Sequence, residues 1–202
     1  MRPKLLGKAV SAFRAGRVGD AAAYKAAAIG ARAYPEIEAR LKALADPLPQ
    51  IDLATLRQLP AGTFGRAYAD HMDCKGLRPL VVSPSVAAEL AGADILAIRY
   101  AVLHDTFHVL LDFDTDLSGE LGVWAFVSKQ RYSPRFRRAG ILARALYTVV
   151  APIKFWQLKA AQACGERMAS EAACLIAEPI QTFWNEHLPT LRHRLGIRPV
   201  SG

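Results

Sequence analysis

Hydrophobic residues recur every three or four positions along most of the chain, the spacing that places them on one face of an α-helix. Residues 20–46 are rich in alanine and predict two helices, with a break at Tyr34-Pro35. Asp94 is predicted to cap a longer apolar helix that runs from Ile95 to about Leu111. This helix carries two histidines four residues apart.

Shorter elements are predicted on either side of that helix. Thr63 fits the N-cap of a helix that ends near Lys75, and Gly76 fits the left-handed position after its end. Residues 79–84 have the pattern of a short extended segment, too short to indicate a sheet. Residues 120–130 predict a further helix that is mostly buried.

The last part of the chain is the most apolar. Residues 139–178, with Pro152 as a kink or boundary, are compatible with plain core or with a tunnel for a long apolar tail. Residues 180–197 predict two short closing helices separated by Pro189. Together these patterns predict an all-α single domain over residues 1–202, built as a multi-helix orthogonal bundle with an apolar interior or tunnel.

Residues 1–19 predict a basic amphipathic helix. The segment has no acid, and its basic and apolar members are Arg2, Lys4, Lys8, Arg14 and Arg17, and Leu5, Leu6, Ala9, Val10 and Phe13. Such a helix can lie on an anionic membrane surface or dock on the core with its charges solvated. A mitochondrial transit peptide is a third interpretation, which the scarcity of serine disfavours.

Composition limits the classes of partner. Of 202 residues, 52% are hydrophobic and 22% are charged, and the net charge is +8, so the chain is globular and suited to acidic partners. Nucleic acid is not expected, because no helix-turn-helix, zinc finger or RNP-like pattern accompanies the charge. Three cysteines at no metal-ligand spacing fit a reducing compartment. The longest late charge-free stretch, residues 145–153, is too short to span a membrane.

A basic run follows the helix predicted at residues 120–130. Its members are Lys129, Arg131, Arg135, Arg137 and Arg138. This run is compatible with binding a diphosphate, an acidic carboxylate of a substrate or lipid headgroups. It is equally compatible with a solvated charged surface.

Residues 104–120, reading HDTFHVLLDFDTDLSGE, contain four potential metal ligands, His104, Asp105, His108 and Glu120. Two histidines four residues apart project from one face of a helix, and Asp105 can approach that face. Glu120 follows a run of turn and helix-start residues, so it is expected on a second helix that returns beside the first.

An isolated HxxxH pair also occurs as two hydrogen-bonded core histidines. Here the added carboxylates favour a metal, because burying so many ionisable groups among apolar neighbours without a partner would be costly. The mixed nitrogen and oxygen set suits a divalent metal, with Zn favoured and Fe, Mn, Co or Mg also compatible. Such an ion can activate a water, polarise a phenol or carboxylate oxygen, or bring O₂ to a substrate.

The HDxxH motif with a Glu after eleven further residues resembles the signature of the fourth coenzyme Q (ubiquinone) biosynthesis protein family. The similarity extends to residues 61–68, which resemble the family's G-T-F-G segment, to Arg99-Tyr100 and, in outline, to Trp184–Ile197. It covers residues 50–198. Two departures are Asp112, where such proteins usually have Gly, and Asn185, where an acidic residue is common; neither is a ligand position.

The resemblance implies a metal-dependent ubiquinone biosynthesis protein that acts on polyprenylated benzoquinone precursors. The implied reaction is oxidative decarboxylation at ring C1, which replaces the carboxyl group by a hydroxyl. His104, Asp105, His108 and Glu120 would be the metal ligands, or one of the carboxylates would act as general base. The implied partners are other coenzyme Q biosynthesis enzymes and an anionic membrane surface. The apolar character of the chain, rather than the resemblance, makes a second copy of the chain a further expected partner. The implied location is cytoplasmic and peripheral to the inner membrane, on the matrix side of the mitochondrial inner membrane in a eukaryote.

Two other functions remain open at the level of sequence. One is a non-catalytic scaffold that binds prenyl lipids and presents them to the biosynthetic complex. The other is a metallohydrolase, which ranks last because the chain has no H-E-x-x-H glutamate and no second HD pair.

Overall fold

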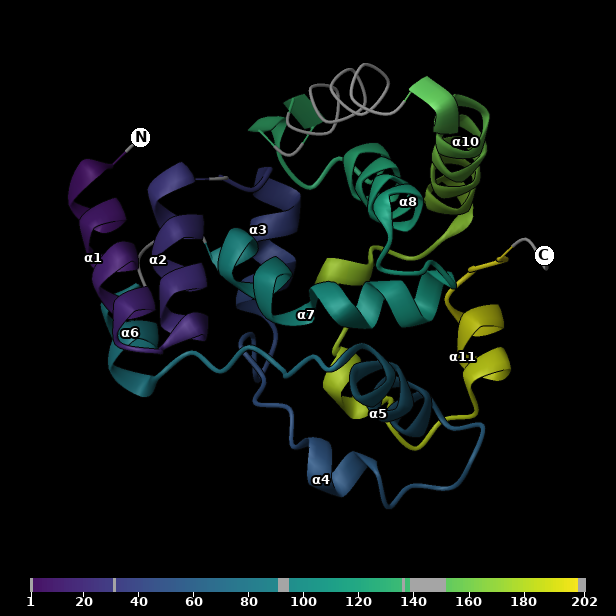
Figure 1. The fold of residues 1–202 in the computed structure, drawn as a ribbon, viewed down its shortest axis with the longest axis horizontal. Helices are drawn as coiled ribbons and strands as arrows, with labels where there is room; N and C mark the ends of the chain where they lie inside the picture. Colours follow the sequence, from purple (N-terminus) through teal and green to yellow (C-terminus); the bar gives the residue numbers. More distant parts are fainter. Residues whose placement is uncertain (1, 31, 91–94, 136, 139–151, 200–202) are drawn as a thin grey trace.

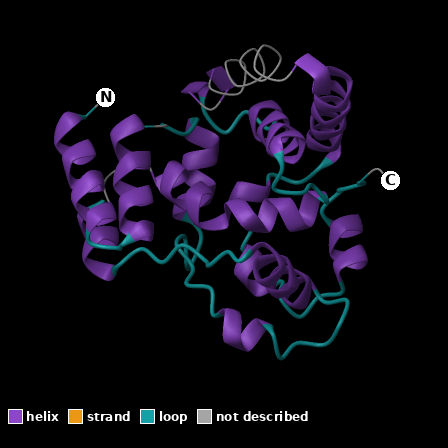
Figure 2. Ribbon diagram, in the orientation of Figure 1, coloured by secondary structure: helices purple, strands orange, loops and turns teal. Residues whose placement is uncertain are grey.

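The computed structural model describes residues 2–30, 32–90, 95–135, 137–138 and 152–199 (Figure 1). Within these residues the regular structure is helical, and the only β-type pairing is an isolated antiparallel bridge between Thr63 and His187 (Figure 2). The prediction of an all-α domain is confirmed. The extended segment predicted at residues 79–84 forms no strand, and from Pro84 the chain is helical because proline is well suited to the first turn.

The described helices follow in chain order. They are α1 (Pro3–Arg14), α2 (Val18–Ile29), α3 (Pro35–Lys42), α4 (Leu53–Leu56), α5 (Phe64–Lys75), α6 (Pro84–Glu89), α7 (Ile95–Leu111), α8 (Leu117–Lys129), α10 (Phe155–Glu171) and α11 (Leu188–Arg194). Short 3₁₀ turns η1 (Pro152–Lys154), η2 (Leu175–Ala177) and η3 (Ile180–Thr182) lie between the later helices.

Helix boundaries follow the local capping signals. Thr63 caps α5, with its Oγ1 accepting a hydrogen bond from the Arg66 amide at 3.3 Å, and Gly76 ends the helix at φ +63°, as predicted. The helix predicted to begin at Glu120 begins three residues earlier. Asp116 is its N-cap, because the Asp116 carboxylate accepts a hydrogen bond from the Gly119 amide at 2.8 Å.

Two expectations for the later chain need correction. Pro189 does not separate two helices but lies in the first turn of α11, where the missing amide hydrogen costs nothing. In the apolar section 139–178, the described α10 buries one face that includes Leu158 and Met168, whereas Ile153 and Trp156 are 100% and 79% exposed. Asp94 and residues 139–151 lie outside the described residues.

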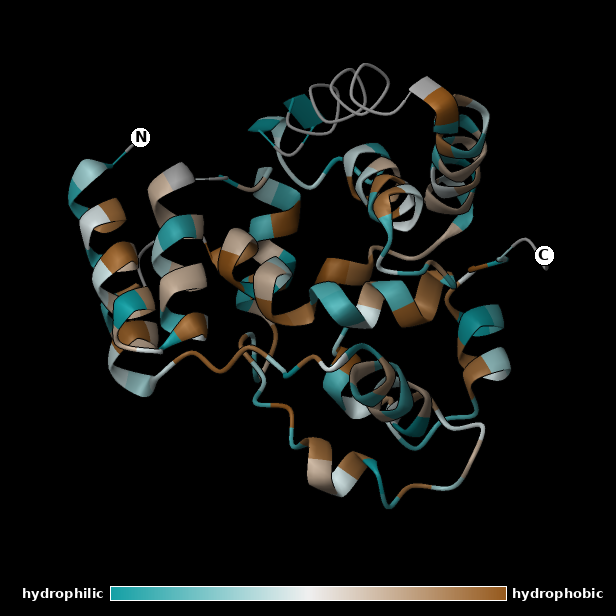
Figure 3. Cartoon of the chain, in the orientation of Figure 1, coloured by the Kyte–Doolittle hydropathy of each residue, from teal (hydrophilic) through white to brown (hydrophobic). Residues whose placement is uncertain are grey.

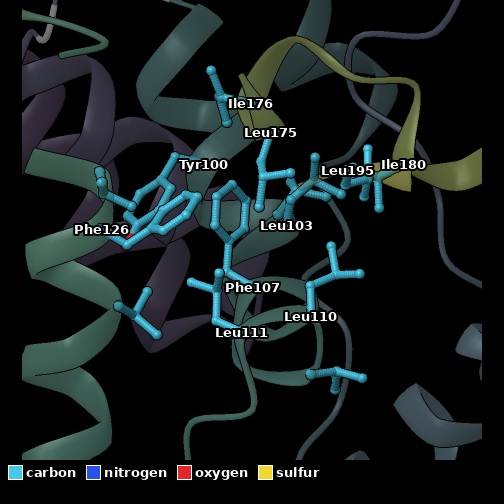
Figure 4. Packing of buried hydrophobic residues seen from close by; sticks show 14 of the residues in the cluster. Tyr100, Leu103, Phe107, Leu110, Leu111, Phe126, Leu175, Ile176, Ile180 and Leu195 are labelled. Atoms are coloured by element: carbon cyan, nitrogen blue, oxygen red, sulfur yellow. The ribbon is translucent and has the colours of Figure 1, made fainter. Parts of the chain in front are cut away.

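Helix α7 is the centre of the main core. Of its 17 residues, 13 are buried, since α2, α5, α8 and η2 all contact it, and Figure 1 shows α8 above and α5 below its C-terminal half. Figure 4 shows Tyr100, Leu103 and Phe107 of α7 packed among Phe126 of α8 and Leu175 near the end of the chain. A helix that is apolar on nearly every side requires neighbours on every side.

The N-terminal helix α1 packs on α2 and buries Ala9 and Ala12 in a second, smaller apolar cluster that also includes Ile98 of α7. The basic segment is therefore docked in this structure. Val10 and Phe13 remain 51% and 66% exposed, and the mixture of apolar and polar residues along α1 is visible in Figure 3. No helix of the described chain has the length and apolar composition needed to cross a membrane.

Arg99 is a fully buried cation that joins α7 to the chain around it. Its guanidinium donates hydrogen bonds to the carbonyl oxygens of Ile176 at 2.7 Å, Pro47 at 2.8 Å and Glu178 at 2.6 Å. Burial lowers the pKa of Arg99 to about 10, so the side chain stays charged at neutral pH. One side chain thus satisfies carbonyls from two connecting segments.

Arg99→Met should lower the free energy of unfolding by about 3 kcal/mol, because it leaves buried carbonyls without donors. Urea unfolding measures the change. Arg40→Met is the matched control, since Arg40 pairs with the side chain of Glu178 at the surface and should cost less than about 1 kcal/mol. Equal losses in the two variants would contradict a structural role for the buried charge.

Candidate metal centre

The candidate centre lies where α7 and α8 face each other. His104 and His108 come from successive turns of α7, and Glu120 comes from the first turn of α8. Their side chains are 25%, 0% and 31% exposed. The few residues of α7 that are not buried include Ala101, His104 and Asp105, so this helix opens toward solvent mainly beside the centre.

Three donor groups converge at distances that suit one ion. The Nε2 atoms of His104 and His108 are 3.2 Å apart, and the Glu120 carboxylate lies 3.4 Å from the first and 3.2 Å from the second. Donors about 2.0–2.2 Å from a tetrahedral ion stand roughly 3.3–3.5 Å apart. The group His104, His108 and Glu120 can therefore hold a metal ion with little movement.

The other ring nitrogens are engaged in ways that orient both histidines. His108 Nδ1 lies 3.2 Å from the Phe113 carbonyl oxygen and 3.1 Å from that of Asp114, so Nδ1 carries the hydrogen that it donates. In the neutral ring this leaves the lone pair on Nε2, which points at the other potential metal ligands, His104 and Glu120. His104 Nδ1 lies 3.1 Å from the hydroxyl of Tyr100.

The charges in the centre depend on one another. Burial alone would raise the pKa of Glu120, but hydrogen bonds from His104 and His108 lower it to about 2. Burial alone would lower the pKa of His108, but its hydrogen bond and charge interaction with Glu120 raise it above 6.5. A protonated His108 beside an ionised Glu120 is thus favoured when no metal competes for the same atoms.

Asp105 lies outside the group of three donors that the structure brings together. Its charge acts on groups on either side: burial and then the Asp105 carboxylate raise the pKa of Tyr68 on α5, and Asp105 also contributes, after Glu120, to raising the pKa of His108. The assignment of Asp105 as a fourth ligand stays a prediction.

The turn between α7 and α8 packs closely against α8. A Cβ on Gly119 would lie 1.7 Å from the carbonyl oxygen of Asp114, and one on Gly122 would lie 2.5 Å from the ring of Phe113. The two glycines therefore allow α8 to approach the carbonyls that orient His108. The spacing of Gly119 and Gly122, three residues apart, is a signal of this close approach that is present in the sequence.

His71 of α5 is closer to the centre than its sequence context indicated. On the helix predicted from Thr63 to Lys75, Asp70 and His71 are compatible with supporting the metal ligands or with an exposed polar face, which is the simpler interpretation. Asp70 is exposed and pairs with Arg66. The ring of His71, however, stacks with that of His108 at a centroid distance of 6.2 Å. Such a contact between helices distant in sequence leaves no local signal.

An apolar cleft of about 370 Å³ borders the centre. Residues of α2, α7 and α8 form most of its wall: Ala22, Lys25, Ala26, Leu80, Ala97, Tyr100, Ala101, His104, Glu120 and Trp124. His104 and Glu120 belong to both the cleft and the donor group. Its size falls in the range of small-molecule sites. None of the described residues 152–178 of the apolar section is among the residues that line it.

The basic run is exposed in its described part, which includes Lys129, Arg131 and Arg135. Lys129 ends α8, whereas Glu120 lies in its first turn. Nine residues of helix separate the two by about 13 Å. The run therefore lies at the opposite end of α8 from the donor group, rather than beside it.

The coupled pKa values predict how pH acts on the metal-free protein. His108 contributes stability below about pH 6.5 that is lost as pH rises through its raised pKa, and Glu120 contributes stability above about pH 4.5 that is lost as pH falls toward 2. The advantage of the wild-type chain over Glu120→Gln in free energy of unfolding should be largest near pH 5–6 in EDTA. In Zn²⁺ the advantage should instead grow with pH, because the metal displaces protons.

Unfolding curves from pH 3 to 8, with EDTA and with Zn²⁺, test this prediction. An advantage that stays constant between pH 5 and 8 in EDTA would show that His108 and Glu120 do not titrate as a pair.

Gly119→Ala should weaken metal binding, because the new methyl group forces the Asp114 carbonyl away from His108. We expect a loss of roughly tenfold or more in Zn²⁺ affinity, measured by competition with a chromophoric chelator. The control is Gly7→Ala in α1, where a Cβ meets nothing within 4 Å and alanine is the better helix former. Unchanged affinity in Gly119→Ala would mean that the turn can move without affecting the centre.

Comparison with protein families gives a match over most of the chain. The profile described as "Coenzyme Q (ubiquinone) biosynthesis protein Coq4" matches residues 48–201. The chain is 31% identical over 164 residues to the protein named ubiquinone biosynthesis protein COQ4 homolog, mitochondrial, of Danio rerio, and 28% identical over 156 residues to that of Bos taurus. These matches cover 76% and 74% of this chain, but 57% and 56% of the relatives, so the chain spans little more than half of their length.

A crystal structure of a putative ubiquinone biosynthesis protein from Nostoc punctiforme PCC 73102 has a similar fold. The TM-score is 0.62 at 22% sequence identity, and the match covers 96% of this chain and 93% of that one. At this level of identity the likeness concerns the fold.

Proposed function

The chain belongs to the coenzyme Q (ubiquinone) biosynthesis protein Coq4 family, and we propose that it acts as a metal-dependent enzyme on polyprenylated benzoquinone precursors. The proposed reaction is oxidative decarboxylation at ring C1. The observation that carries the proposal is the sharing of His104 and Glu120 between the donor group and the apolar cleft. A ligand in that cleft would have its polar end beside the donors.

The cleft suits a ligand with a polar ring and an apolar tail. Four alanines from α2 and α7 contribute small apolar side chains to its walls, and Trp124 and Tyr100 contribute aromatic surface. Lys25 is the cation in its wall, and a carboxylate on the ligand would interact favourably with it. Apolar walls also keep water away from the reacting ring, which strengthens electrostatic interactions there.

Each protein group has a proposed part in the chemistry. His104, His108 and Glu120 would hold a divalent ion, which supplies a Lewis acid for a phenol or carboxylate oxygen and, if redox-active, access to O₂. We favour Zn and keep Fe, Mn, Co or Mg as outcomes of metal analysis. Asp105 is proposed as a fourth ligand or as a general base. Replacing a ring carboxyl by a hydroxyl releases CO₂ and removes two electrons, so an oxidant such as O₂ must be supplied.

The proposed setting follows the family. Other coenzyme Q biosynthesis enzymes, an anionic membrane surface and a second copy of the chain are the proposed partners, with the protein peripheral to the inner membrane. The exposed side chains of the basic run and of Val10 and Phe13 support contact with such a surface.

Turnover of a carboxylated, prenylated phenol tests the proposal. Metal-loaded protein in liposomes under air should release CO₂ and form the ring-hydroxylated product. His108→Ala should lower the rate at least 100-fold and remove the metal, while binding of the prenylated phenol changes less than about threefold. Asp105→Asn should lower turnover too, with metal retained if Asp105 is the base.

His193→Ala is the control, since His193 is an exposed histidine of α11 outside the donor group. A metal-free His108→Ala protein that still forms product at the normal rate would overturn the catalytic proposal. Prenyl-lipid binding without any turnover by the metal-loaded wild-type chain would favour the scaffold instead, and the apolar cleft is the feature that supports that second function.

A further inference from the structure

The C-terminal turn of α7 has an unusual residue at its tightest point. Asp112 follows the last residue of the helix at φ +62°, and the Phe113 amide donates to the His108 carbonyl at 3.1 Å. This is the common way to end a helix, and glycine is the usual residue because its backbone adopts positive φ without a Cβ clash. An aspartate there needs another interaction to hold it.

Arg192 of α11 provides that interaction from 80 residues away. Its guanidinium donates hydrogen bonds to the carbonyl oxygens of Leu110 at 2.9 Å and Val109 at 2.8 Å, and to the Asp112 carboxylate at 2.8 Å. The carbonyls belong to the last turn of α7, where a cation also interacts favourably with the helix dipole. The Arg192 side chain is 18% exposed, so its bonds to the two carbonyls are partly shielded from water, whereas the Asp112 side chain is 56% exposed.

The turn that Arg192 holds is the one that orients His108. The next two residues after Asp112 are Phe113 and Asp114, whose carbonyls accept the Nδ1–H of His108. Lys75 of α5 pairs with the Asp114 carboxylate at 2.5 Å, and Gly119 of α8 lies against the Asp114 carbonyl. Helices α5, α8 and α11 thus hold three successive residues of one turn.

We infer that Arg192 is a positioning residue for the metal centre, which acts through the Asp112 turn to hold His108 Nδ1–H and so direct Nε2 at the ion. The inference rests on the proposed metal binding of the centre. Arg192 and His108 line a common pocket, but the hydrogen bonds of Arg192 go to Val109, Leu110 and Asp112 rather than to a member of the donor group. Its effect would pass from the Asp112 turn to the carbonyls of Phe113 and Asp114, which share the Nδ1–H of His108.

The neighbouring arginine of the same helix provides a matched control. Arg194 instead pairs with Glu186 at 2.7 Å and lies over the ring of Phe183 at 4.4 Å, both away from α7 in sequence. Arg192→Met and Arg194→Met remove equal side chains from α11. Only the first should change the geometry of His108.

The test uses the full chain with Co²⁺ as the metal probe. Arg192→Met should weaken Co²⁺ binding by about 10–100-fold and alter the visible absorption of the bound ion, whereas Arg194→Met should stay within about twofold of wild type. In the metal-free protein, the imidazole Nδ1–H signal in the proton NMR spectrum, assigned by its loss in His108→Ala, should broaden in Arg192→Met only. Circular dichroism confirms that each variant is folded at the temperature used.

A second substitution separates this role from mere stabilisation. Asp112→Gly makes positive φ unstrained, so Arg192→Met combined with Asp112→Gly should regain at least about tenfold of the lost Co²⁺ affinity. No recovery, or an Arg192→Met protein that is less stable yet keeps the wild-type affinity and Nδ1–H signal, would overturn the inference. If the wild-type chain binds no Co²⁺, the proposed metal function fails, and the Nδ1–H signal still tests whether Arg192 positions His108.

Discussion

Burial of α7 on nearly every side is the constraint on which the rest of the structure depends. Because the helix is apolar around most of its circumference, α5, α8 and segments near both ends of the chain must pack on it, and all of them converge on the main core. The exceptions are few, and two of them are His104 and Asp105. The centre therefore lies where the otherwise complete packing of α7 opens toward solvent.

Two arginines connect this central helix to distant parts of the chain. Arg99 donates hydrogen bonds to carbonyls of one segment that precedes α7 in the sequence and one that follows it. Arg192 donates to carbonyls in the last turn of α7 itself. In both cases a mostly buried guanidinium donates hydrogen bonds to backbone carbonyl oxygens. Its several N–H groups lie in one plane and can reach carbonyls that point in different directions, which a lysine ammonium does less well. These contacts hold the ends of α7 as the apolar contacts hold its middle.

The charges of the centre are compatible with binding of a metal ion in place of a proton. Hydrogen bonds from the two histidines keep Glu120 ionised, and the Glu120 carboxylate favours the protonated form of His108. The three groups therefore interact favourably with one another when no ion is bound. An incoming cation takes the place of a proton among atoms that are already spaced about 3.2–3.4 Å apart. The site is thus organised by the fold before metal arrives, which reduces the cost of binding.

The helical periodicity, the caps at Thr63 and Gly76 and the motif from His104 to Glu120 could be read from the sequence, because each depends on residues a few positions apart. The contributions of Arg192 and His71 could not, because each acts across a contact between helices that are remote in the chain. Ile153 and Trp156 lie in a section whose sequence is compatible with core or tunnel, yet both are exposed, because exposure depends on what packs beside a residue and not only on its own hydrophobicity. The sequence by itself determined the helices and the donor residues, whereas only the tertiary structure decided which donors meet and what orients them.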